Sequence, residues 1–361
     1  MTVEFIGMIA TRKASEIHAA TGPTIDRDYV RQFAQAHEAA GFDRVLVAYH
    51  STGPDAFLVT SYAAAVTGRI GFMLAHRPGF VEPTLAARKL ATLDQFSSGR
   101  LAVHIISGGD DAEQRRDGDF LGHDERYART DEYLDVLRRI WTSNEPFDHH
   151  GKYYRFEAGF SEVKAVQTPH IPVYFGGASD AAIAVAGRHA DVYALWGETQ
   201  AQVREQIARV RAAAKGRPVR FSVSFRPILA ETEAAAWARA DSILERVREQ
   251  RRASGLGTGD PKQSEGARRL LAAAEGGDRV DQRLWTAVAR ETGARANSTA
   301  LVGTPAQVAD ALLDYYELGV TTFLIRGFDP LEDAVDYGRD LIPLTRRLVA
   351  ERSDRRRSKA G

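Results

Sequence analysis

The chain of 361 residues contains no cysteine. This absence excludes thiol catalysis, cysteine metal ligands and disulfide bonds, and it fits a reducing compartment. An excess of charge of one sign is also lacking, because 48 Lys and Arg residues balance 48 Asp and Glu residues. Without an overall basic field, we expect neither nucleic acid nor an anionic membrane surface as a partner.

Long apolar runs are missing as well. None approaches the roughly 20 residues that a membrane-spanning helix needs. Residues 1–5 (MTVEF) lack the basic segment and the apolar core of a secretory signal. We therefore expect a cytoplasmic protein without a membrane anchor.

Several catalytic and ligand-binding motifs are absent too. We find no Gly-x-Ser-x-Gly nucleophile elbow, no His-Glu-x-x-His zinc motif and no P-loop. The ten His residues show no metal-ligand spacing, so we expect no metal site. The Gly-x-Gly-x-Gly sequence at 255–259 follows no predicted strand and is interpreted as a loop, not as a dinucleotide fingerprint. These absences disfavour a hydrolase or an aldolase.

What the sequence does contain is a regular alternation of short apolar runs with longer helical patterns. The apolar runs predict strands at 5–9, 44–48, 70–74, 101–106, 173–175, 192–195, within 219–229 and at 322–325. Their near-continuous apolar character is typical of parallel strands covered on both faces. Eight such units favour a (β/α)8 TIM barrel, with a doubly wound open sheet as the alternative. In a barrel, functional residues lie at the carboxyl ends of the strands.

The organisation around the predicted barrel is simple. We predict one domain over residues 1–350. Residues 253–298 exceed an ordinary connection, and we expect them to form a lid on the active face of the barrel. Residues 351–361 are rich in Arg and are predicted to be a disordered basic tail.

One strand–turn–helix unit favours an anionic ligand. The apolar run 173–175 ends in Gly176 and Gly177, and Ser179 is placed to cap the helix that follows. Glycine lets the backbone approach a ligand closely, and a helix N-terminus offers unpaired N–H groups and a partial positive charge. A phosphate would fit this turn. The alternative is an ordinary strand-to-helix turn.

Aromatic, His, Arg and hydroxyl-bearing residues gather at the other predicted strand ends. They are Tyr49, His50, Ser51, Thr52, His76, Arg77, Trp196, Arg226 and Arg326. His123 and Tyr127 are four residues apart and share one face if their helix begins before them. Planar and cationic side chains around one barrel mouth suit a flat, anionic, aromatic ligand such as flavin mononucleotide (FMN). Each residue taken alone also has a purely structural interpretation.

Four of these motifs together resemble a known family. Residues 103–108 (VHIISG), 123–127 (HDERY), 174–179 (YFGGAS) and 195–198 (LWGE) look like the bacterial luciferase-like flavin monooxygenases, most closely the alkanesulfonate monooxygenase branch. The resemblance implies a TIM barrel that uses O2 and reduced FMN from a separate NAD(P)H-dependent FMN reductase. It also implies oxidation of a carbon that bears a sulfonate, release of sulfite and an aldehyde, and a homodimer or homotetramer.

The resemblance also implies roles for individual residues. The cofactor would be bound by His76, His104, His123, Tyr127, Gly177, Ala178 and Ser179. Among these, His123, Tyr127 and Ser179 would hold the phosphate, and His76 would lie by the flavin ring. The catalytic candidates are Trp196, Arg226, Arg295 and His50. Trp196 would line the substrate side. Arg226 and the lid residue Arg295 would bind the sulfonate, although Arg226 could instead pair with a barrel carboxylate and only support the fold.

The chain departs from the alkanesulfonate pattern at three strand ends. Gly53 aligns with a Cys, residues 224–226 (SFR) replace Arg-x-His, and residues 328–330 (FDP) replace Tyr-x-His. The altered pocket remains cationic and offers hydroxyl groups, which suits a hydroxylated sulfonate such as sulfoquinovose. Simple alkanesulfonates are one alternative substrate class. A deazaflavin (F420)-dependent dehydrogenase and a flavin-storing protein without turnover are alternative functions.

Overall fold

The computed structural model describes residues 2–255, 264–295 and 298–360, without the side chains of 356–360. Residue contacts divide the chain into two compact units. Unit 1 comprises residues 1–45, 194–208 and 220–361, and unit 2 comprises residues 46–193 and 209–219. Each unit is described by itself below. The single domain over 1–350 stays a prediction.

All eight predicted strands are present. They are β1 (Glu4–Ile9), β2 (Arg44–Val47), β3 (Gly71–His76), β4 (Leu101–Ile105), β7 (Val173–Gly176), β8 (Val192–Trp196), β9 (Arg220–Leu229) and β13 (Val320–Ile325). They pair in the order β9-β13-β1-β2-β3-β4-β7-β8, and β9 also pairs with β8, which closes the sheet. Their registers are parallel wherever β1, β3, β4, β7, β9 and β13 pair. The predicted (β/α)8 barrel is therefore confirmed.

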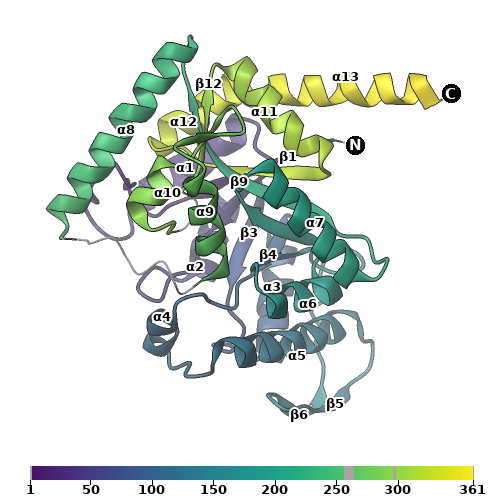
Figure 1. Ribbon diagram of the computed structural model, residues 1–361. Coiled ribbons are helices and arrows are strands. Elements are labelled where there is room, and N and C mark those ends of the chain that lie inside the picture. Colours follow the sequence, from purple (N-terminus) through teal and green to yellow (C-terminus); the bar gives the residue numbers. More distant parts are fainter. Residues whose placement is uncertain (1, 256–263, 296–297, 361) are drawn as a thin grey trace. The chain divides into compact units, whose positions relative to one another are not determined.

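Helices alternate with these strands (Figure 1). They are α1 (Arg27–Ala39), α2 (Ala56–Ala65), α3 (Pro83–Phe96), α4 (Asp111–Arg116), α5 (His123–Thr142), α6 (Asp180–His189), α7 (Gln200–Ala214), α8 (Glu233–Ala253), α9 (Glu265–Glu275), α10 (Ala287–Thr292), α11 (Pro305–Glu317), α12 (Pro330–Asp336) and α13 (Ile342–Ala360). A π-helical turn, Tyr337–Leu341, joins α12 to α13. Within the described ranges, no helix combines the length and the apolar character that crossing a bilayer requires.

The helix starts follow local sequence. Asp26 accepts hydrogen bonds from the N–H groups of Asp28 and Tyr29 at the start of α1. Thr304 and Gln307 form a reciprocal capping box at the start of α11, where Pro305 occupies the first turn. Such caps satisfy N–H groups that have no partner within the helix, and they fix where each helix begins.

Among the residues described, five short strands lie outside the eight-stranded barrel. In unit 2, β5 (Phe147–His150) and β6 (Arg155–Gly159) form an antiparallel hairpin after α5 (Figure 1). In unit 1, β12 (Ala300–Gly303) runs parallel to the second half of β9. Two further strands, β11 (Leu284–Trp285) and β10 (Arg279–Val280), continue this edge antiparallel. Residues 264–295 of the predicted lid are therefore an ordered insertion that extends the sheet.

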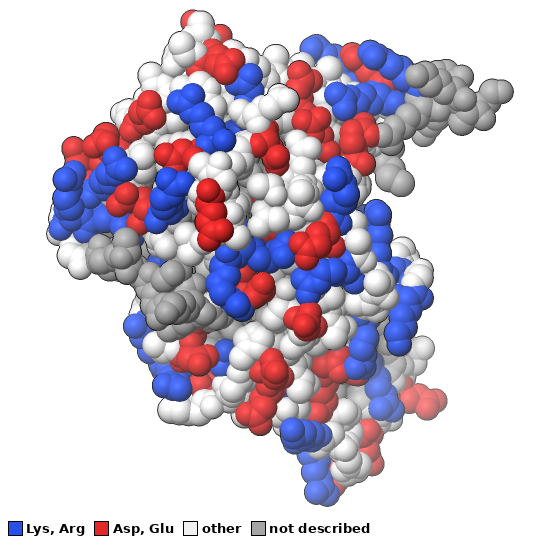
Figure 2. Space-filling view, in the orientation of Figure 1, with Lys and Arg blue, Asp and Glu red and all other residues white. Residues whose placement is uncertain are grey.

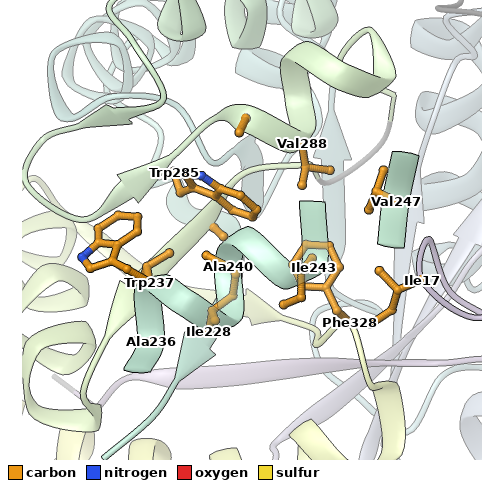
Figure 3. Packing of buried hydrophobic residues seen from close by; sticks show 13 residues of the cluster. Ile17, Ile228, Ala236, Trp237, Ala240, Ile243, Val247, Trp285, Val288 and Phe328 are labelled. Carbon is orange, nitrogen blue, oxygen red and sulfur yellow. The ribbon is translucent and has the colours of Figure 1, made fainter. Parts of the chain in front are cut away.

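A hydrophobic cluster in unit 1 holds this insertion (Figure 3). Trp285 and Val288 of the insertion pack with Ile243 of α8 and with Phe328, which follows β13. Ile17, from the irregular segment between β1 and α1, is buried in the same cluster. Burial of these large apolar side chains contributes on the order of 1.5–3 kcal/mol each, so the cluster ties the β1–α1 segment to the insertion.

The interior of the barrel can be recognised in unit 1 from polar contacts. Thr322 Oγ1 donates to Glu4 Oε2 at 3.2 Å, and Arg220 Nη1 lies 3.9 Å from the same oxygen. These three side chains, from β13, β1 and β9, therefore share one face of the sheet. They form a polar layer near the starts of the strands.

Strand alternation carries this interior face to the carboxyl ends. Arg226 lies an even number of residues after Arg220 and so shares its face. Phe225 lies on the opposite face, where its ring packs 4.8 Å from that of Tyr315 in α11. By the same alternation, Arg326, just beyond β13, faces the interior. Arg226 and Arg326 therefore lie inside the barrel at the end where barrel enzymes carry their active sites.

Unit 2 shows the same arrangement. Strand registers place Ala75 of β3, His104 of β4 and Tyr174 of β7 in one row. Phe175 points the other way and packs against Tyr127 of α5, with ring centroids 6.4 Å apart. The row that contains His104 therefore faces the barrel interior.

The C-terminal segment differs from the sequence prediction. A disordered tail was expected at 351–361, but α13 is helical as far as Ala360. No Gly or Pro interrupts residues 344–360. Glu351 also lies 3.9 Å from Arg347 and 3.9 Å from Arg355, and such pairs, four residues apart, stabilise a helix.

The surface carries charges of both signs. Figure 2 shows Lys and Arg side chains mixed with Asp and Glu side chains over the face in view. This mixture agrees with the balanced composition of the chain. The face in view thus offers no broad field of one sign that would attract a polyanion.

Candidate active site

The β7–α6 turn of unit 2 has the geometry that its glycines predict. Gly177 has φ +141°, and a Cβ at this position would lie 2.6 Å from Tyr127 Oη and 2.8 Å from Ala182 Cβ. Only glycine therefore fits beneath Tyr127. Ser179 Oγ accepts a hydrogen bond from the Ala182 N–H at 3.2 Å, which confirms Ser179 as the cap of α6.

Two residues of α5 complete this turn. The rings of His123 and Tyr127 lie 4.9 Å apart, edge to face, so the two residues share one face of the helix as predicted. Burial raises the pKa of Tyr127, and interaction with the Ser179 side chain opposes this effect, so the phenol keeps its proton. Ala178, half-buried, lies within the turn between Gly177 and Ser179.

The electrostatics of this turn suit an anion. The first turn of α6 offers N–H groups and a partial positive charge. Asp180 lies in the same turn, but Arg209 Nη2 lies 2.5 Å from Asp180 Oδ1 and balances its charge. His123, exposed at the rim, has its Nδ1 2.7 Å from Asp124 Oδ1. A phosphate at this turn would therefore meet hydroxyl and N–H donors without an unpaired carboxylate from Asp180.

His104 lies in the interior row and is close to the same turn. A Cβ at Gly176 would lie 3.3 Å from His104 Cε1. The Nδ1 atom of His104 is buried and has no hydrogen-bond partner among the residues that the structure describes. Burial lowers the pKa of His104 to about 4, so the ring is neutral at about pH 7. A buried polar atom without a partner is uncommon, and here it suits contact with a ligand.

His76 lies on the other face of the barrel wall. Its Nε2 lies 2.6 Å from Tyr133 Oη of α5, and its ring packs edge to face on Phe57 of α2 at 5.6 Å. Burial lowers its pKa to about 4, and the positive charge of Lys89 adds to this effect. The structure thus places His76 among helix residues, apart from the row of His104. Contact with a flavin ring stays a prediction, and the hydrogen bond to Tyr133 accounts for this His as a structural residue.

A cluster of charged and aromatic residues lies beyond β2 and β3, and Glu113 is the member that sequence reasoning missed. Arg77 Nη2 lies 2.7 Å from Glu113 Oε2 of α4, and the guanidinium of Arg77 covers the Tyr49 ring at 4.7 Å. His50 is exposed, and its Nδ1 lies 3.8 Å from Glu113 Oε1. The Ser51 N–H donates to the same oxygen at 3.1 Å.

Glu113 stays ionised over a wide pH range. Interactions with His50, with Arg77 and with the Ser51 N–H lower the pKa of Glu113 to about 2, against the effect of burial. Within the described residues, Arg77 Nε and Nη1 and Ser51 Oγ are buried without hydrogen-bond partners. The sequence signal was available for Arg77, which follows a predicted strand. It was weak for Glu113, because the segment after β4 lacks helical periodicity.

Arg226 pairs with a carboxylate, as the structural alternative for this residue predicted. It faces the interior of the barrel and is 1% exposed. Its Nη1 lies 2.7 Å from Glu16 Oε2, its Nη2 donates to the Gly327 carbonyl at 2.9 Å, and its guanidinium covers the Phe328 ring at 3.5 Å. Arg326 binds the other oxygen of Glu16 through Nη2. The alternative role, pairing with a carboxylate, is thus observed, and binding of a sulfonate by Arg226 stays a prediction.

Burial and charge act in opposite directions on this trio. Burial alone would raise the pKa of Glu16, but Arg226 and Arg326 outweigh it and lower the pKa to about 2. Burial lowers the pKa of Arg226 to about 10, with Glu16 opposing this effect. Glu16 and Arg226 are therefore both charged at about pH 7.

Trp196, at the end of β8, packs on the insertion of unit 1. It is 36% exposed. A Cβ at Gly266 of α9 would lie 2.6 Å from Trp196 Nε1, so the helix approaches the indole at its one glycine. Nearby, Arg269 of α9 forms an ion pair of 2.9 Å with the buried carboxylate of Glu198. Helix α9 is therefore docked on the segment that follows β8.

The remaining predictions are less well placed. Arg295 is exposed after α10, and no ion pair or hydrogen bond joins it to another described residue. Part of the predicted lid, at 256–263 and 296–297, lies outside the described residues. Asp131, Asp135 and His189 come together as possible metal ligands, but Arg188 pairs with both carboxylates. A neutralised ion-pair cluster explains these three residues without a metal.

Comparison with known proteins gives the family. A crystal structure of riboflavin lyase (RcaE) with modified FMN and riboflavin is similar at a TM-score of 0.76 and 20% identity, over 96% of this chain and 92% of that one. EDTA monooxygenase (EmoA) from Chelativorans sp. BNC1 is similar at 0.74 and 21%, over 96% and 94% of the two chains. DmoA from Hyphomicrobium sulfonivorans is similar at 0.75 and 22%, over 96% and 88%. The family profile described as luciferase-like monooxygenase matches residues 3–322, and this match shows that the chain belongs to the luciferase-like monooxygenases.

Proposed function

We propose that this protein is an FMN-dependent monooxygenase that desulfonates a hydroxylated organosulfonate. When bound, reduced FMN supplies the two electrons that activate O2. The balanced reaction is FMNH2 + O2 + R–CH2–SO3⁻ → FMN + H2O + R–CHO + HSO3⁻. One oxygen atom enters the aldehyde and the other enters water, and the C–S bond breaks.

The β7–α6 turn supports FMN as the cofactor. Gly177 leaves the space that a close ligand needs, and Tyr127 and Ser179 present hydroxyl groups at the start of α6. Their donors and the helix N-terminus suit a phosphate dianion. His104, on the interior row, offers an unpaired Nδ1 to the flavin. Riboflavin lyase and EDTA monooxygenase share the fold of this chain, and the former was solved with modified FMN.

The arginine pair is the single observation that carries the choice of substrate. Arg226 and Arg326 lie on the interior face at the ends of β9 and β13, and both already contact the carboxylate of Glu16. A sulfonate is an anion at any working pH, and planar guanidinium groups bind two of its oxygens at once. Ser224 lies on the same face of β9 as Arg226 and offers a hydroxyl to a hydroxylated substrate such as sulfoquinovose.

The partners follow from the proposed chemistry. The sequence carries no nicotinamide fingerprint, so we infer that a separate NAD(P)H-dependent FMN reductase supplies the reduced flavin. A homodimer or homotetramer and a cytoplasmic location belong to the same proposal. The insertion that contains α9 would act as the lid that excludes water from the reaction.

One experiment tests the function directly. Purified protein is supplied with FMN, an FMN reductase and NADH, and oxygen uptake and sulfite release are measured with sulfoquinovose, a simple alkanesulfonate and the matching carboxylate. We expect sulfite release with sulfoquinovose above that with the alkanesulfonate, and none with the carboxylate. Absence of sulfite with every sulfonate would reject desulfonation. Failure of reduced FMN to bind at all would reject the flavin assignment as well.

A further inference from the structure

Glu16 bridges the two arginines of the barrel mouth. Its Oε2 lies 2.7 Å from Arg226 Nη1, and its Oε1 contacts Arg326 Nη2. One anionic group thus contacts two guanidinium groups through two different oxygens. A bound sulfonate would make the same pair of contacts.

The contacts of Glu16 leave hydrogen-bonding capacity unused. The ion pair with Arg226 lacks hydrogen-bond geometry, and neither Glu16 Oε2 nor Arg226 Nη1 makes a hydrogen bond with any described residue. The Nε atoms of Arg226 and Arg326 are likewise buried without acceptors in the described part of the chain. A tetrahedral anion with three oxygens could satisfy more of these donors than the carboxylate does.

The backbone at Glu16 is held from both sides. Ile17 is buried in the cluster that contains Phe328 (Figure 3), and His18 Nε2 lies 2.5 Å from Asp329 Oδ1. Ser15 and His18 also exchange backbone hydrogen bonds of 3.0 and 3.3 Å. The Glu16 side chain is 30% exposed, whereas that of Arg226 is 1% exposed. The carboxylate can therefore turn towards solvent while its backbone and the guanidinium stay in place.

A small cavity lies beside the two arginines. It has a volume of about 40 Å³, and Arg226 and Arg326 line it together with Ser15, His37 and Tyr337. Since ~10–15 Å³ of such space holds one water molecule, the cavity has room for a few waters. Exchange with Glu16 would give a sulfonate the place of the carboxylate as well.

The neighbouring charged groups pair among themselves. Arg239 Nη2 lies 2.6 Å from Asp333 Oδ1 and 3.3 Å from Asp329 Oδ2, and Asp329 also pairs with His18. One guanidinium group thus faces two carboxylates, so these neighbours add no excess positive charge. Beside them, the two positive charges of Arg226 and Arg326 meet the single negative charge of Glu16, and this local excess favours an incoming anion.

We propose that Glu16 is an internal counter-ion that occupies the substrate anion site, and that a substrate sulfonate binds by exchange with its carboxylate. The proposal rests on the function proposed above. It makes Glu16 a specificity-determining residue, because an uncharged group cannot take over contacts with two guanidinium groups. Substrates without an anionic end would leave Glu16 in place and gain nothing from Arg226 and Arg326.

The test measures anion binding and needs no turnover. Methanesulfonate is titrated by calorimetry into the flavin-free wild type, Glu16→Gln and Glu332→Gln. Glu332 is the matched control, because it lies in the same unit and pairs with Lys13 at the surface. We expect Glu16→Gln to bind methanesulfonate at least about tenfold more tightly, since a competing charged hydrogen bond is removed. Glu332→Gln should bind like the wild type.

Two further observations separate the outcomes. A crystal structure of the wild type with methanesulfonate should show sulfonate oxygens on Arg226 and Arg326 with Glu16 turned away. If Glu16→Gln folds poorly by itself, methanesulfonate should raise its melting temperature more than that of the wild type. Unchanged affinity, Glu16 still on both arginines, or no stabilisation of the variant would each overturn the proposal. Tighter binding without sulfite release in turnover would instead leave the proposal standing and reject desulfonation.

Discussion

Gly266 lies against the indole of Trp196, so close that a Cβ at position 266 would be 2.6 Å from Trp196 Nε1. This contact joins the inserted helix α9 to the end of β8, where catalytic side chains are expected in a barrel. The ion pair of Arg269 with Glu198 holds the same two segments. The position of Trp196 therefore depends on how α9 is docked.

The first prediction concerns this docking. Gly266→Val should force the helix or the indole to move, with a loss of about 1–3 kcal/mol of stability for overpacking. Limited proteolysis should then cut within 253–298 faster than in the wild type, and tryptophan fluorescence should shift. Gly68→Ala is the control, because a Cβ there meets no atom within 4 Å. Unchanged proteolysis of Gly266→Val would show that the contact does not hold α9.

The second prediction concerns the phosphate turn. Ser179→Ala and Tyr127→Phe should each weaken the binding of reduced FMN by about 1.5–3 kcal/mol, the contribution of a charge-assisted hydrogen bond. Binding is measured anaerobically by fluorescence quenching. Reduced riboflavin, which lacks the phosphate, should bind the wild type weakly and both variants equally weakly. Equal affinity of the wild type for FMN and riboflavin would contradict a phosphate site at this turn.

The third prediction concerns acid stability. Burial lowers the pKa values of His37, His76 and His104 to about 4 each. Since the unfolded chain takes up these protons at a pKa near 6.5, stability should fall as the pH drops from about 6.5 towards 4. Each His accounts for up to about 3 kcal/mol across this window. Urea unfolding at several pH values should show this fall, and a smaller one in His37→Phe.

If the free energy of unfolding of His37→Phe fell equally with decreasing pH, His37 would not be buried in its neutral form in the wild type. His37 is suited to the comparison because its ring packs between Phe33 and Phe42, at 4.6 and 4.7 Å, outside the proposed FMN site. The hydrogen bond from His37 Nδ1 to the Phe33 carbonyl would be lost in the variant. The variant is therefore compared by the change with pH and not by its absolute stability.

The barrel could be predicted because its strands are short, apolar and regularly spaced. The β7–α6 turn could be predicted as well, because Gly176, Gly177 and Ser179 act locally on the backbone. By contrast, the sequence could not predict which face of the sheet carries a given side chain at a strand end. Ala75 and His76 are neighbours, yet one faces the interior and the other the helices, and a strand that is apolar on both faces carries no alternation to tell them apart.

The ion-pair partners that lie in irregular or very short segments could not be predicted either. Glu16 lies between β1 and α1 in a stretch without periodicity, and Glu113 lies on a helix of only six residues. Neither position carries a local signal that points to an arginine far along the chain. The pairs Glu16–Arg226 and Glu113–Arg77 arise from tertiary structure, and both change what the arginines can do.

The last prediction concerns Arg226. Arg226→Met should lower kcat/KM for the sulfonate by about 10²-fold or more, matching the loss of a charged contact of about 3 kcal/mol. Binding of reduced FMN should stay normal, because Tyr127, Gly177 and Ser179 keep their geometry. Glu16 still pairs with Arg326 in this variant, so the melting temperature should change little.

The double variant Glu16→Gln with Arg226→Met tells the two roles of Arg226 apart. If Arg226 only neutralises Glu16, removing both charges should restore stability and turnover together. If Arg226 binds the sulfonate, the double variant should be as stable as the wild type and still turn over about 10²-fold more slowly. Sulfite release at the wild-type rate from a stable Arg226→Met protein would exclude both roles, and the anion site would then have to be sought at Arg77, whose Nε and Nη1 are buried without acceptors in the described residues.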